Sequence, residues 1–248
     1  MAENVDPLQG LRVLVVGASS GIGAATTTLL HDHGARVVGA ARRVERISEL
    51  GVDAVPCDLL DPESCARAVA EAVDLLGGLD ALVIISGLSM LVPLQQTTHA
   101  DWQRVLDTNL VGPALVTRAA LEHLQAPGSA GRVVFASSDS AALPYPGMVL
   151  YGTAKRGLEA FSDGLAHEYP ALHSTYVVIG PTHDTEMGRD WDPELLTPWL
   201  QRWLDEGYLR FGPQLSAEVA EVFADVLRSP TPPRSVEAVN RLESPEIK

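Results

Sequence analysis

The amino-acid sequence predicts a single α/β domain built on a doubly wound parallel sheet, with helices on both faces. Short apolar runs alternate along the chain with longer segments of helical periodicity. This alternation is typical of parallel strands joined by crossover helices, and several runs are apolar throughout, as strands covered on both faces are. A chain of 248 residues without a linker-like segment suits one domain, so we expect residues 1–248 to fold together.

The expected strands are the apolar runs Leu11–Val16, Ala35–Ala41, Ala54–Cys57, Ala81–Ile85, Arg132–Ala136 and Thr175–Ile179. The expected helices are Ile22–His33, Glu63–Leu76, Asp101–Leu124, Val149–Glu168 and Ala217–Arg228, and a short last strand lies near Ser235–Asn240. Two local signals support these boundaries. Gly34 can end the first helix, and Asp61 followed by Pro62 can begin the second.

Composition and charge exclude several classes of function. The net charge is −14, from 32 acidic and 18 basic residues, so most of the surface repels nucleic-acid backbones and anionic lipids. The N-terminal residues lack the basic and apolar parts of a signal peptide. Cys57 and Cys65 are too few for a disulfide framework, and the seven histidines show no metal-ligand spacing. We expect a soluble cytoplasmic protein without a nucleic-acid, membrane or metal partner.

A glycine-rich turn separates the first expected strand from the first expected helix. In this context backbone N–H groups and the helix dipole can bind a pyrophosphate, and a side chain at Gly21 or Gly23 would block the approach. An ordinary tight turn is the alternative, because the spacing is one insertion away from the usual dinucleotide fingerprint. The position between strand and helix favours a dinucleotide site. Its expected residues in this turn are Gly17, Ser19, Ser20, Gly21, Ile22 and Gly23.

Two arginines follow the second strand, after Ala41. A site for NAD normally has an acidic residue there, which binds the ribose 2′-hydroxyl, and this chain has none. Arg42 can instead bind a 2′-phosphate, with hydroxyl groups of the glycine turn as further donors. The sequence therefore predicts NADP(H) in preference to NAD(H). For Arg43 and Arg46 we favour a solvated helix face.

Asp58 follows the third strand, beside Leu59, and precedes a capped helix. Its carboxylate can accept a hydrogen bond from the amino group of an adenine. A loop carboxylate bonded to the local backbone is nearly as good an interpretation of these residues alone.

Ser138, Tyr151 and Lys155 together suggest proton transfer. Ser138 lies beyond the strand Arg132–Ala136, at the edge where open α/β sheets bind ligands, and Tyr151 and Lys155 begin the next helix one turn apart. A phenol has an ordinary pKa of about 10, and an ammonium beside it favours the phenolate. Ser138 would orient the substrate oxygen. A Tyr-x-x-x-Lys pair is also common on helix surfaces, but the serine and the glycine turn favour the catalytic interpretation.

From Leu11 to about Asn240 the chain resembles the short-chain dehydrogenase/reductase family. The residues that carry the resemblance are the glycine turn, Asp58, Asn109, Ser138, Tyr151 with Lys155, and Pro181 with Thr185. The resemblance implies a Rossmann fold and a catalytic tetrad of Asn109, Ser138, Tyr151 and Lys155. In such a tetrad Asn109 holds a water molecule that links Lys155 to solvent.

The same resemblance implies contacts with the cofactor. Asp58 would contact the adenine, Thr185 would contact the nicotinamide carboxamide, and Ile179 or Pro181 would line the nicotinamide pocket. Gly87 is a further expected cofactor contact.

Two stretches depart from the family pattern. Ile84-Ile85-Ser86-Gly87 stands where the family usually has Asn-Asn-Ala-Gly, although apolar packing can replace polar bracing. Pro181-Thr182 replaces Pro-Gly, and the C-terminal segment Arg234–Leu242 lacks the usual glycine-rich ending. The second departure concerns quaternary contacts, since relatives are mostly homodimers or homotetramers and the resemblance implies the same here.

By this resemblance the protein interconverts a ketone and a secondary alcohol. NADPH would deliver hydride to the carbonyl carbon while Tyr151 donates a proton to the oxygen. Two other functions stay open. One is a dinucleotide-binding sensor or scaffold with little turnover, favoured by the Ile84-Ile85 replacement, and the other is epimerisation or dehydration through a transient ketone.

Residues 188–213 occupy the place of the family's substrate lid and are rich in aromatic residues. We expect Tyr145, Met148 and Trp191 to contact the substrate together with Ser138, which favours an apolar carbonyl compound. For Trp199 and Trp203, packing of the lid on the core or on another subunit is an equally good explanation.

Overall fold

A parallel sheet lies at the centre of the computed structural model, which describes residues 6–126 and 130–241. The seven strands of this sheet are β1 (Arg12–Val16), β2 (Arg36–Ala41), β3 (Asp53–Pro56), β4 (Ala81–Ile84), β5 (Arg132–Ala136), β6 (His173–Ile179) and β8 (Ser235–Ala238). Their order is β3-β2-β1-β4-β5-β6-β8, and each strand is parallel to its neighbours. The chain reverses its direction of winding between β1 and β4, and doubly wound sheets bind ligands beside such a point. The predicted fold class is confirmed.

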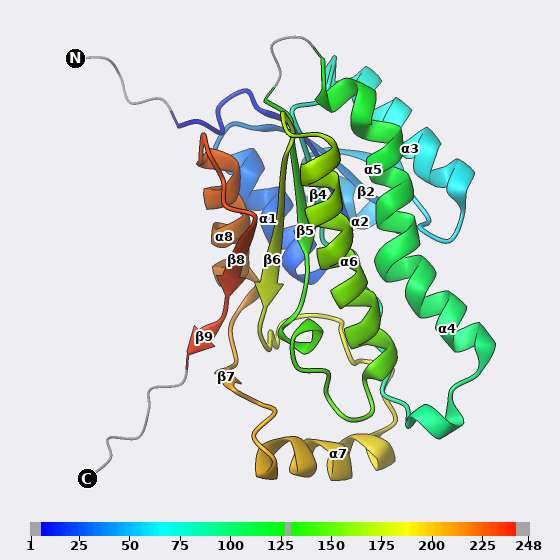
Figure 1. Cartoon of the computed structure of the whole chain (residues 1–248). Coiled ribbons are helices and arrows are strands. Elements are labelled where there is room, and N and C mark those ends of the chain that lie inside the picture. Colours follow the sequence, from blue (N-terminus) through cyan, green and yellow to red (C-terminus); the bar gives the residue numbers. More distant parts are fainter. Residues whose placement is uncertain (1–5, 127–129, 242–248) are drawn as a thin grey trace, which may run out of the picture.

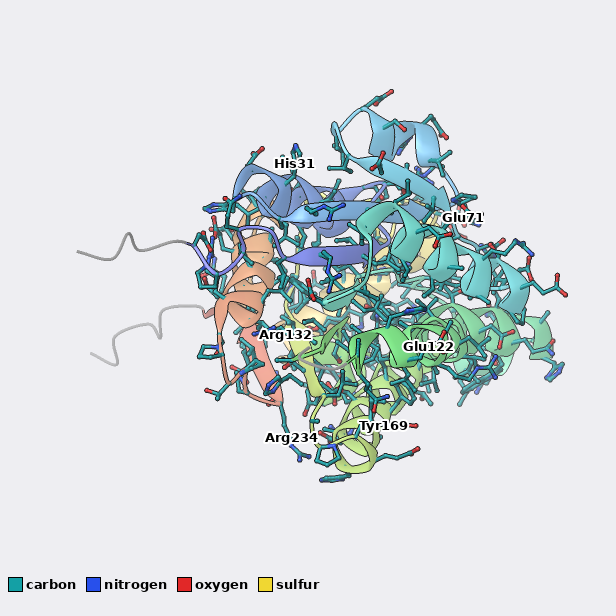
Figure 2. All side chains as sticks on the ribbon, turned by 90° about the horizontal axis from the view of Figure 1, so that it is seen from above. His31, Glu71, Glu122, Arg132, Tyr169 and Arg234 are labelled. Carbon is teal, nitrogen blue, oxygen red and sulfur yellow. The ribbon has the colours of Figure 1, made fainter. Side chains whose placement is uncertain are left out.

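Helices cover both faces of the sheet (Figure 1). On one face α1 (Gly21–Asp32) packs against α8 (Ser216–Arg228), and on the other lie α3 (Pro62–Leu76), α5 (Gly112–Leu124) and α6 (Val149–Glu168). The shorter helices are α2 (Val44–Ser48), α4 (His99–Leu106) and α7 (Pro193–Asp205). Figure 2 looks onto the amino ends of the strands, with Arg132 at the start of β5 and Arg234 just before β8. The carboxyl ends, at the opposite edge, face α7 (Figure 1).

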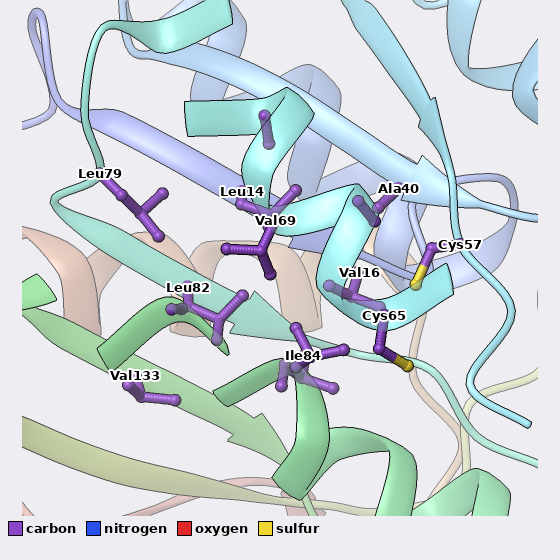
Figure 3. Close-up of a cluster of buried hydrophobic side chains, with 14 of the residues drawn as sticks. Leu14, Val16, Ala40, Cys57, Cys65, Val69, Leu79, Leu82, Ile84 and Val133 are labelled. Carbon is purple, nitrogen blue, oxygen red and sulfur yellow. The ribbon is translucent and has the colours of Figure 1, made fainter. Parts of the chain in front are cut away.

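Alternating side chains of the strands build two apolar layers. Leu14 and Val16 belong to the layer under α3 and α5, whereas Val13 and Val15 belong to the layer under α1 and α8, as the two-residue period of a strand requires. Figure 3 shows the first layer, where Leu14 of β1 and Leu82 of β4 lie near Val69 of α3. These layers hold the strand ends in fixed positions, and the strand ends carry the site.

The expected helix Asp101–Leu124 is two helices with a π-helical turn between them, at Asp107–Val111. Pro113 supplies the reason, because proline has no N–H to donate to the carbonyl of Asn109, four residues earlier. The N–H of Gly112 bonds instead to the carbonyl of Asp107. A sequence reading based on apolar periodicity missed this break, which places Asn109 in the widened turn.

The structure also adds elements that the sequence analysis did not predict. The helices α2 and α7 are both new, and α7 lies inside the expected lid segment. The last expected strand is divided into β8 and β9 (Asn240–Arg241), and β9 pairs with β7 (Phe211–Gly212) in a small antiparallel sheet. Leu242, the end of the segment that departs from the family pattern, lies outside the described residues.

The predicted helix boundaries at Gly34 and Asp61 agree with the structure. Gly34, just past α1, has a φ of 82°, which favours glycine. Asp61 caps α3 by accepting a hydrogen bond from the N–H of Glu63 at 2.9 Å. Across the ranges that the structure describes, no helix combines the length and apolar character needed to cross a membrane.

Candidate active site

A pocket of about 870 Å³ opens at the carboxyl edge of the sheet. It runs from the glycine turn and the ends of β2 and β3 to α6 and the expected lid. All residues predicted to bind cofactor or substrate line it, namely Gly17, Ser19, Ser20, Gly21, Ile22, Gly23, Arg42, Asp58, Leu59, Gly87, Ser138, Tyr145, Met148, Tyr151, Lys155, Pro181, Thr185 and Trp191. Asn109 is fully buried behind this wall.

The glycine turn is built for close backbone approach. Gly17 has a φ of 95°, and a Cβ atom on it would lie 2.7 Å from the backbone nitrogen of Ser86. A Cβ atom on Gly23 would lie 2.1 Å from the carbonyl oxygen of Gly17. In α1, which starts at Gly21, the first turn contains no acidic residue, and no side chain of the described residues caps it. Its backbone N–H groups and positive dipole end therefore suit a pyrophosphate, and the residues present fit a dinucleotide.

The Ile84-Ile85-Ser86 stretch is accommodated by packing. Ile84 is buried in the layer under α3 and α5, and Ile85 packs against the opposite layer. The N–H groups of Ile85 and Ser86 both bond to the carbonyl of Val16. The end of β4 is thus joined to the end of β1 without amide side chains.

Arg43 lies in the site, and the interpretation of Arg43 as part of a solvated helix face is wrong. Its guanidinium donates from Nη2 to the hydroxyl of Ser20 at 3.2 Å and to that of Ser19 at 3.4 Å. Arg42, the residue favoured by the sequence analysis, lines the same pocket but is more exposed. Arg43 is the N-cap residue of α2, just before the helix begins, and its side chain reaches the serines of the glycine turn. Arg46 is 44% exposed and pairs with Glu186.

Asp58 lies at the pocket and is hydrogen-bonded to the neighbouring backbone. It lines the pocket, and its Oδ1 accepts a hydrogen bond from the N–H of Leu60 at 3.0 Å. Its own N–H donates to the hydroxyl of Ser64. Local bonds therefore fix the orientation of the carboxylate at the pocket edge.

Tyr151 and Lys155 are both buried and lie together on α6. The Nζ atom of Lys155 is 5.7 Å from the centre of the Tyr151 ring and donates to the carbonyl of Ala136, at the end of β5, at 2.8 Å. Burial lowers the pKa of Lys155 to about 8. Burial also raises the pKa of Tyr151, against the opposing effect of a hydrogen bond with Ser138. The expected lowering of the Tyr151 pKa by Lys155 is therefore wrong for this arrangement, since desolvation dominates.

Ser138 belongs to a buried hydrogen-bond network that sequence reasoning did not foresee. Its hydroxyl donates to Oδ1 of Asp139 at 3.1 Å and accepts from the N–H and the hydroxyl of Ser140. Tyr145 donates to Oδ2 of Asp139 at 2.6 Å. Burial raises the pKa of Asp139, and the bonds from Tyr145 and Ser138 oppose that rise. An acidic residue directly after Ser138 was the available signal for this network.

Asn109 fixes the loop beside Lys155. Its amide exchanges two hydrogen bonds with the backbone of Leu88, at 3.1 and 2.9 Å, and donates a third to the carbonyl of Val105. A Cβ atom on Gly87 would lie 3.3 Å from Oδ1 of Asn109 and 3.5 Å from Nζ of Lys155. The side chain of Asn109 is therefore fully used in hydrogen bonds to backbone groups. The backbone carbonyl of Asn109 accepts no helical hydrogen bond from Pro113, which has no N–H.

Aromatic side chains close the other end of the pocket. Trp203 is buried, donates from Nε1 to the carbonyl of Pro146 at 2.9 Å and packs on Tyr145 with ring centres 5.3 Å apart. Trp203 therefore anchors α7 on the core. The Nε1 atom of Trp191 is also buried but has no hydrogen-bond partner within the described part of the chain. Met148 and Leu91 belong to the same apolar cluster.

Comparison with known proteins gives consistent results. A model of the short chain dehydrogenase family matches residues 12–195. Hydroxynaphthalene reductase arp2 from Aspergillus fumigatus is 35% identical over 185 residues, which are 71% of this chain and 67% of that protein. Serine 3-dehydrogenase from Rhizobium radiobacter is 36% identical over 160 residues, which are 62% of this chain and 64% of that protein. Glycine betaine reductase ATRR from Emericella nidulans is 33% identical over 201 residues, but the match covers only 16% of that longer protein.

Solved structures share the fold over almost the whole chain. A short chain dehydrogenase from Burkholderia cenocepacia in complex with NADP is 29% identical, with a TM-score of 0.77, and the match covers 93% of this chain and 97% of that one. A short-chain dehydrogenase from Streptomyces avermitilis is 27% identical, with a TM-score of 0.80, and covers 92% of this chain and 88% of that one. From the family match over residues 12–195 and these likenesses it follows that the chain is a member of the short-chain dehydrogenase/reductase family and an NAD(P)-dependent oxidoreductase.

Proposed function

We propose that this protein is an NADP(H)-dependent oxidoreductase that interconverts a ketone and a secondary alcohol. One observation carries the proposal: Ser138, Tyr151 and Lys155 line one end of the pocket whose other end is the glycine turn. A dinucleotide bound by its pyrophosphate at the turn would have its nicotinamide near Ser138, Tyr151 and Lys155. Asn109, which holds the neighbouring loop, completes the proposed tetrad.

The bound cofactor supplies the hydride, and the side chains of the protein supply the proton and the orientation. Because burial raises its pKa, Tyr151 is protonated near neutrality and can donate to the substrate oxygen. Ser138 orients the same oxygen by redirecting the hydroxyl proton that it donates to Asp139. Lys155, held by the carbonyl of Ala136, binds the nicotinamide ribose and returns a proton to Tyr151.

We propose that Arg43, with Arg42 beside it, binds the 2′-phosphate of NADP(H). A guanidinium already fixed beside two serine hydroxyls is a suitable donor set for a phosphate. Asp58 and Leu59 would contact the adenine, and Thr185 the nicotinamide. The relative from Burkholderia cenocepacia was solved with NADP, which supports the same cofactor here.

The test of cofactor choice compares kcat/KM for NADPH and NADH. We expect NADPH to be preferred, and Arg43→Gln to lower kcat/KM for NADPH by about tenfold or more, since a charge-assisted bond to phosphate contributes roughly 1.5–3 kcal/mol. Arg67→Gln, which removes a guanidinium on the exposed side of α3, is the matched control. A preference for NADH in the wild type refutes the cofactor assignment.

We propose that residues 188–213 form the substrate lid and that the substrate is an apolar, ring-containing ketone. The buried N–H of Trp191, together with Tyr145 and Met148, supports a ligand with a large apolar surface and a hydrogen-bond acceptor near the indole. The test is a panel of ketones of graded size with NADPH, read by cofactor oxidation. Substrate binding without oxidation across the panel would favour a sensor, and conversion without net oxidation would favour an epimerase.

A cytoplasmic location and a homodimeric or homotetrameric state also stay predictions. Both thiols of the chain, Cys57 and Cys65, are free and buried, which suits a reducing compartment. The oligomeric state is measured by sedimentation of the purified protein.

A further inference from the structure

Glu186 lies where the segment after β6 passes the glycine turn, and three arginines surround it. Its Oε2 accepts from Nη2 of Arg43 at 2.7 Å, and its Oε1 accepts from Nη1 of Arg46 at 2.8 Å. Nη1 of Arg189 is 3.3 Å from the same Oε1. One carboxylate thus joins Arg43, the N-cap residue of α2, and Arg46, within α2, to the segment that leads into the proposed lid.

The arginines form a cationic corner in a strongly acidic protein. Arg42, Arg43, Arg46 and Arg189 are four of its 18 basic residues, in a chain of net charge −14. Hydrogen bonds from Arg43, the largest cause, and from Arg46 lower the pKa of the Glu186 carboxyl group to about 2. The carboxylate is therefore ionised near neutral pH.

The Glu186 carboxylate is bound by Arg43 in the way that an anionic ligand such as a phosphate would be bound. Arg43 uses both terminal nitrogens on Glu186, at 3.2 and 2.7 Å, and also donates to the hydroxyls of Ser19 and Ser20. Guanidinium groups and hydroxyls are the donors that bind phosphate dianions. A carboxylate presents two of the oxygens that a phosphate would present there.

We propose that Glu186 is an internal mimic of the 2′-phosphate and competes with it for Arg43 and Arg46. This inference rests on the proposed binding of NADP(H) by Arg43. The 2′-phosphate takes over the N–H groups that Glu186 occupies, and the carboxylate turns outward into solvent. NAD(H), with a hydroxyl at this place, leaves the Glu186 bonds intact. Glu186 therefore sets how strongly the enzyme discriminates between the two cofactors.

Two features make competition the outcome instead of joint binding. A phosphate dianion beside the Glu186 carboxylate would place like charges within a few ångströms, which is unfavourable when they share the same donors. The side chain of Glu186 is 33% exposed, so water can solvate the carboxylate once it is displaced. An ion pair exposed to this extent contributes little to folding stability. Breaking the Arg43–Glu186 pair so that Arg43 can bind a phosphate therefore costs little stability.

The test uses Glu186→Gln with Glu194→Gln as the matched control. Glu194 is an exposed carboxylate on the same segment, in the first turn of α7, and its loss changes the net charge equally. The probes are adenosine 2′-monophosphate and adenosine 5′-monophosphate by calorimetry, and NADPH and NADH by fluorescence titration. We expect Glu186→Gln to lower Kd for NADPH and for adenosine 2′-monophosphate by roughly 3- to 10-fold, with NADH and adenosine 5′-monophosphate changed by less than about twofold.

An equal gain for all four probes, no gain, or weaker binding of the 2′-phosphate probes would overturn the proposal. Weaker binding would mean that Glu186 holds Arg43 in position for the phosphate. If Glu186 competes with the phosphate, Glu186→Ala, compared at equal thermal stability, also lowers Kd for NADPH and adenosine 2′-monophosphate. A wild type that prefers NADH would refute the proposed cofactor choice, while the selective gain in Glu186→Gln would still identify the mimic, so the two failures are distinguishable.

Discussion

Replacing Tyr145 by phenylalanine removes one hydrogen bond from the buried Asp139 carboxylate. The bond is short, at 2.6 Å, and Tyr145 and Asp139 are both 6% exposed, so water cannot readily replace the lost donor. A hydrogen bond to a charged group contributes about 1.5–3 kcal/mol. We therefore expect Tyr145→Phe to lower the free energy of unfolding by about 2 kcal/mol near neutral pH, which is roughly 4–8 °C in Tm for a chain of this size.

The pH dependence of this loss has a defined sign. Burial raises the folded-state pKa of Asp139 above its ordinary 3.8, and the Tyr145 bond limits that rise, so the pKa is higher in the variant. A carboxyl group with a raised folded-state pKa contributes its full stability at low pH and loses it as pH rises through that pKa. The penalty of Tyr145→Phe is therefore larger at a pH above the raised pKa of Asp139 than at a pH below it.

Urea denaturation at the two pH values measures both quantities. Tyr169→Phe is the control, because its hydroxyl bonds to the exposed Glu168 while its partly buried ring is kept. We expect Tyr169→Phe to change stability by less than about 0.5 kcal/mol at either pH. A loss in Tyr145→Phe no larger than the control, or a larger loss at low pH, would refute the assigned charge state of the network.

Two further predictions concern the glycine turn and the buried lysine. Gly23→Ala places a Cβ atom 2.1 Å from the carbonyl oxygen of Gly17, so calorimetry should show a loss of unfolding free energy of at least about 2 kcal/mol, together with weaker NADPH binding. In the control Gly164→Ala on α6, a Cβ atom meets nothing within 4 Å, and the protein should gain about 0.5–1 kcal/mol of stability. Similar effects of both changes would contradict the close packing at Gly23. Lys155→Met removes a group whose pKa falls from 10.5 to about 8 on folding. Because such a group adds stability as pH rises between these values, the wild type should gain more stability than the variant from about pH 7 to about pH 10. Parallel pH profiles of stability in the two proteins would contradict the burial of the ammonium group.

The fold was predictable because its signals are local and repeated. Each predicted apolar run is a strand in the structure. Asp61 caps the start of α3 and Gly34 follows the end of α1, as predicted. The break at Asn109 was missed since apolar periodicity continues through Gly112 and Pro113, and only the missing N–H of the proline indicates it. The helix α7 was not predicted, although packing of Trp203 on the core was one of the two interpretations of its aromatic residues, and that packing holds the helix in place.

The sequence predicted residues that do line the pocket, but it did not predict their pKa shifts. The glycine turn, Ser138, Tyr151 and Lys155 meet in one pocket. The sequence spacing suggested that Lys155 lowers the pKa of Tyr151, but burial raises that pKa in the folded chain. Contacts between distant segments are not encoded in spacing, which is why the Arg43–Glu186 pair, 143 residues apart, appeared only in three dimensions.

The turnover of Tyr151→Phe most directly tests the central claim that Tyr151 is the proton donor of a hydride-transfer site. The change removes one hydroxyl and keeps the buried ring, so NADPH should bind with nearly wild-type affinity in a fluorescence titration. With a ketone that the wild type reduces, kcat should fall by roughly 10²-fold or more, the usual contribution of a positioned acid. Near-normal turnover with NADPH bound would contradict the account.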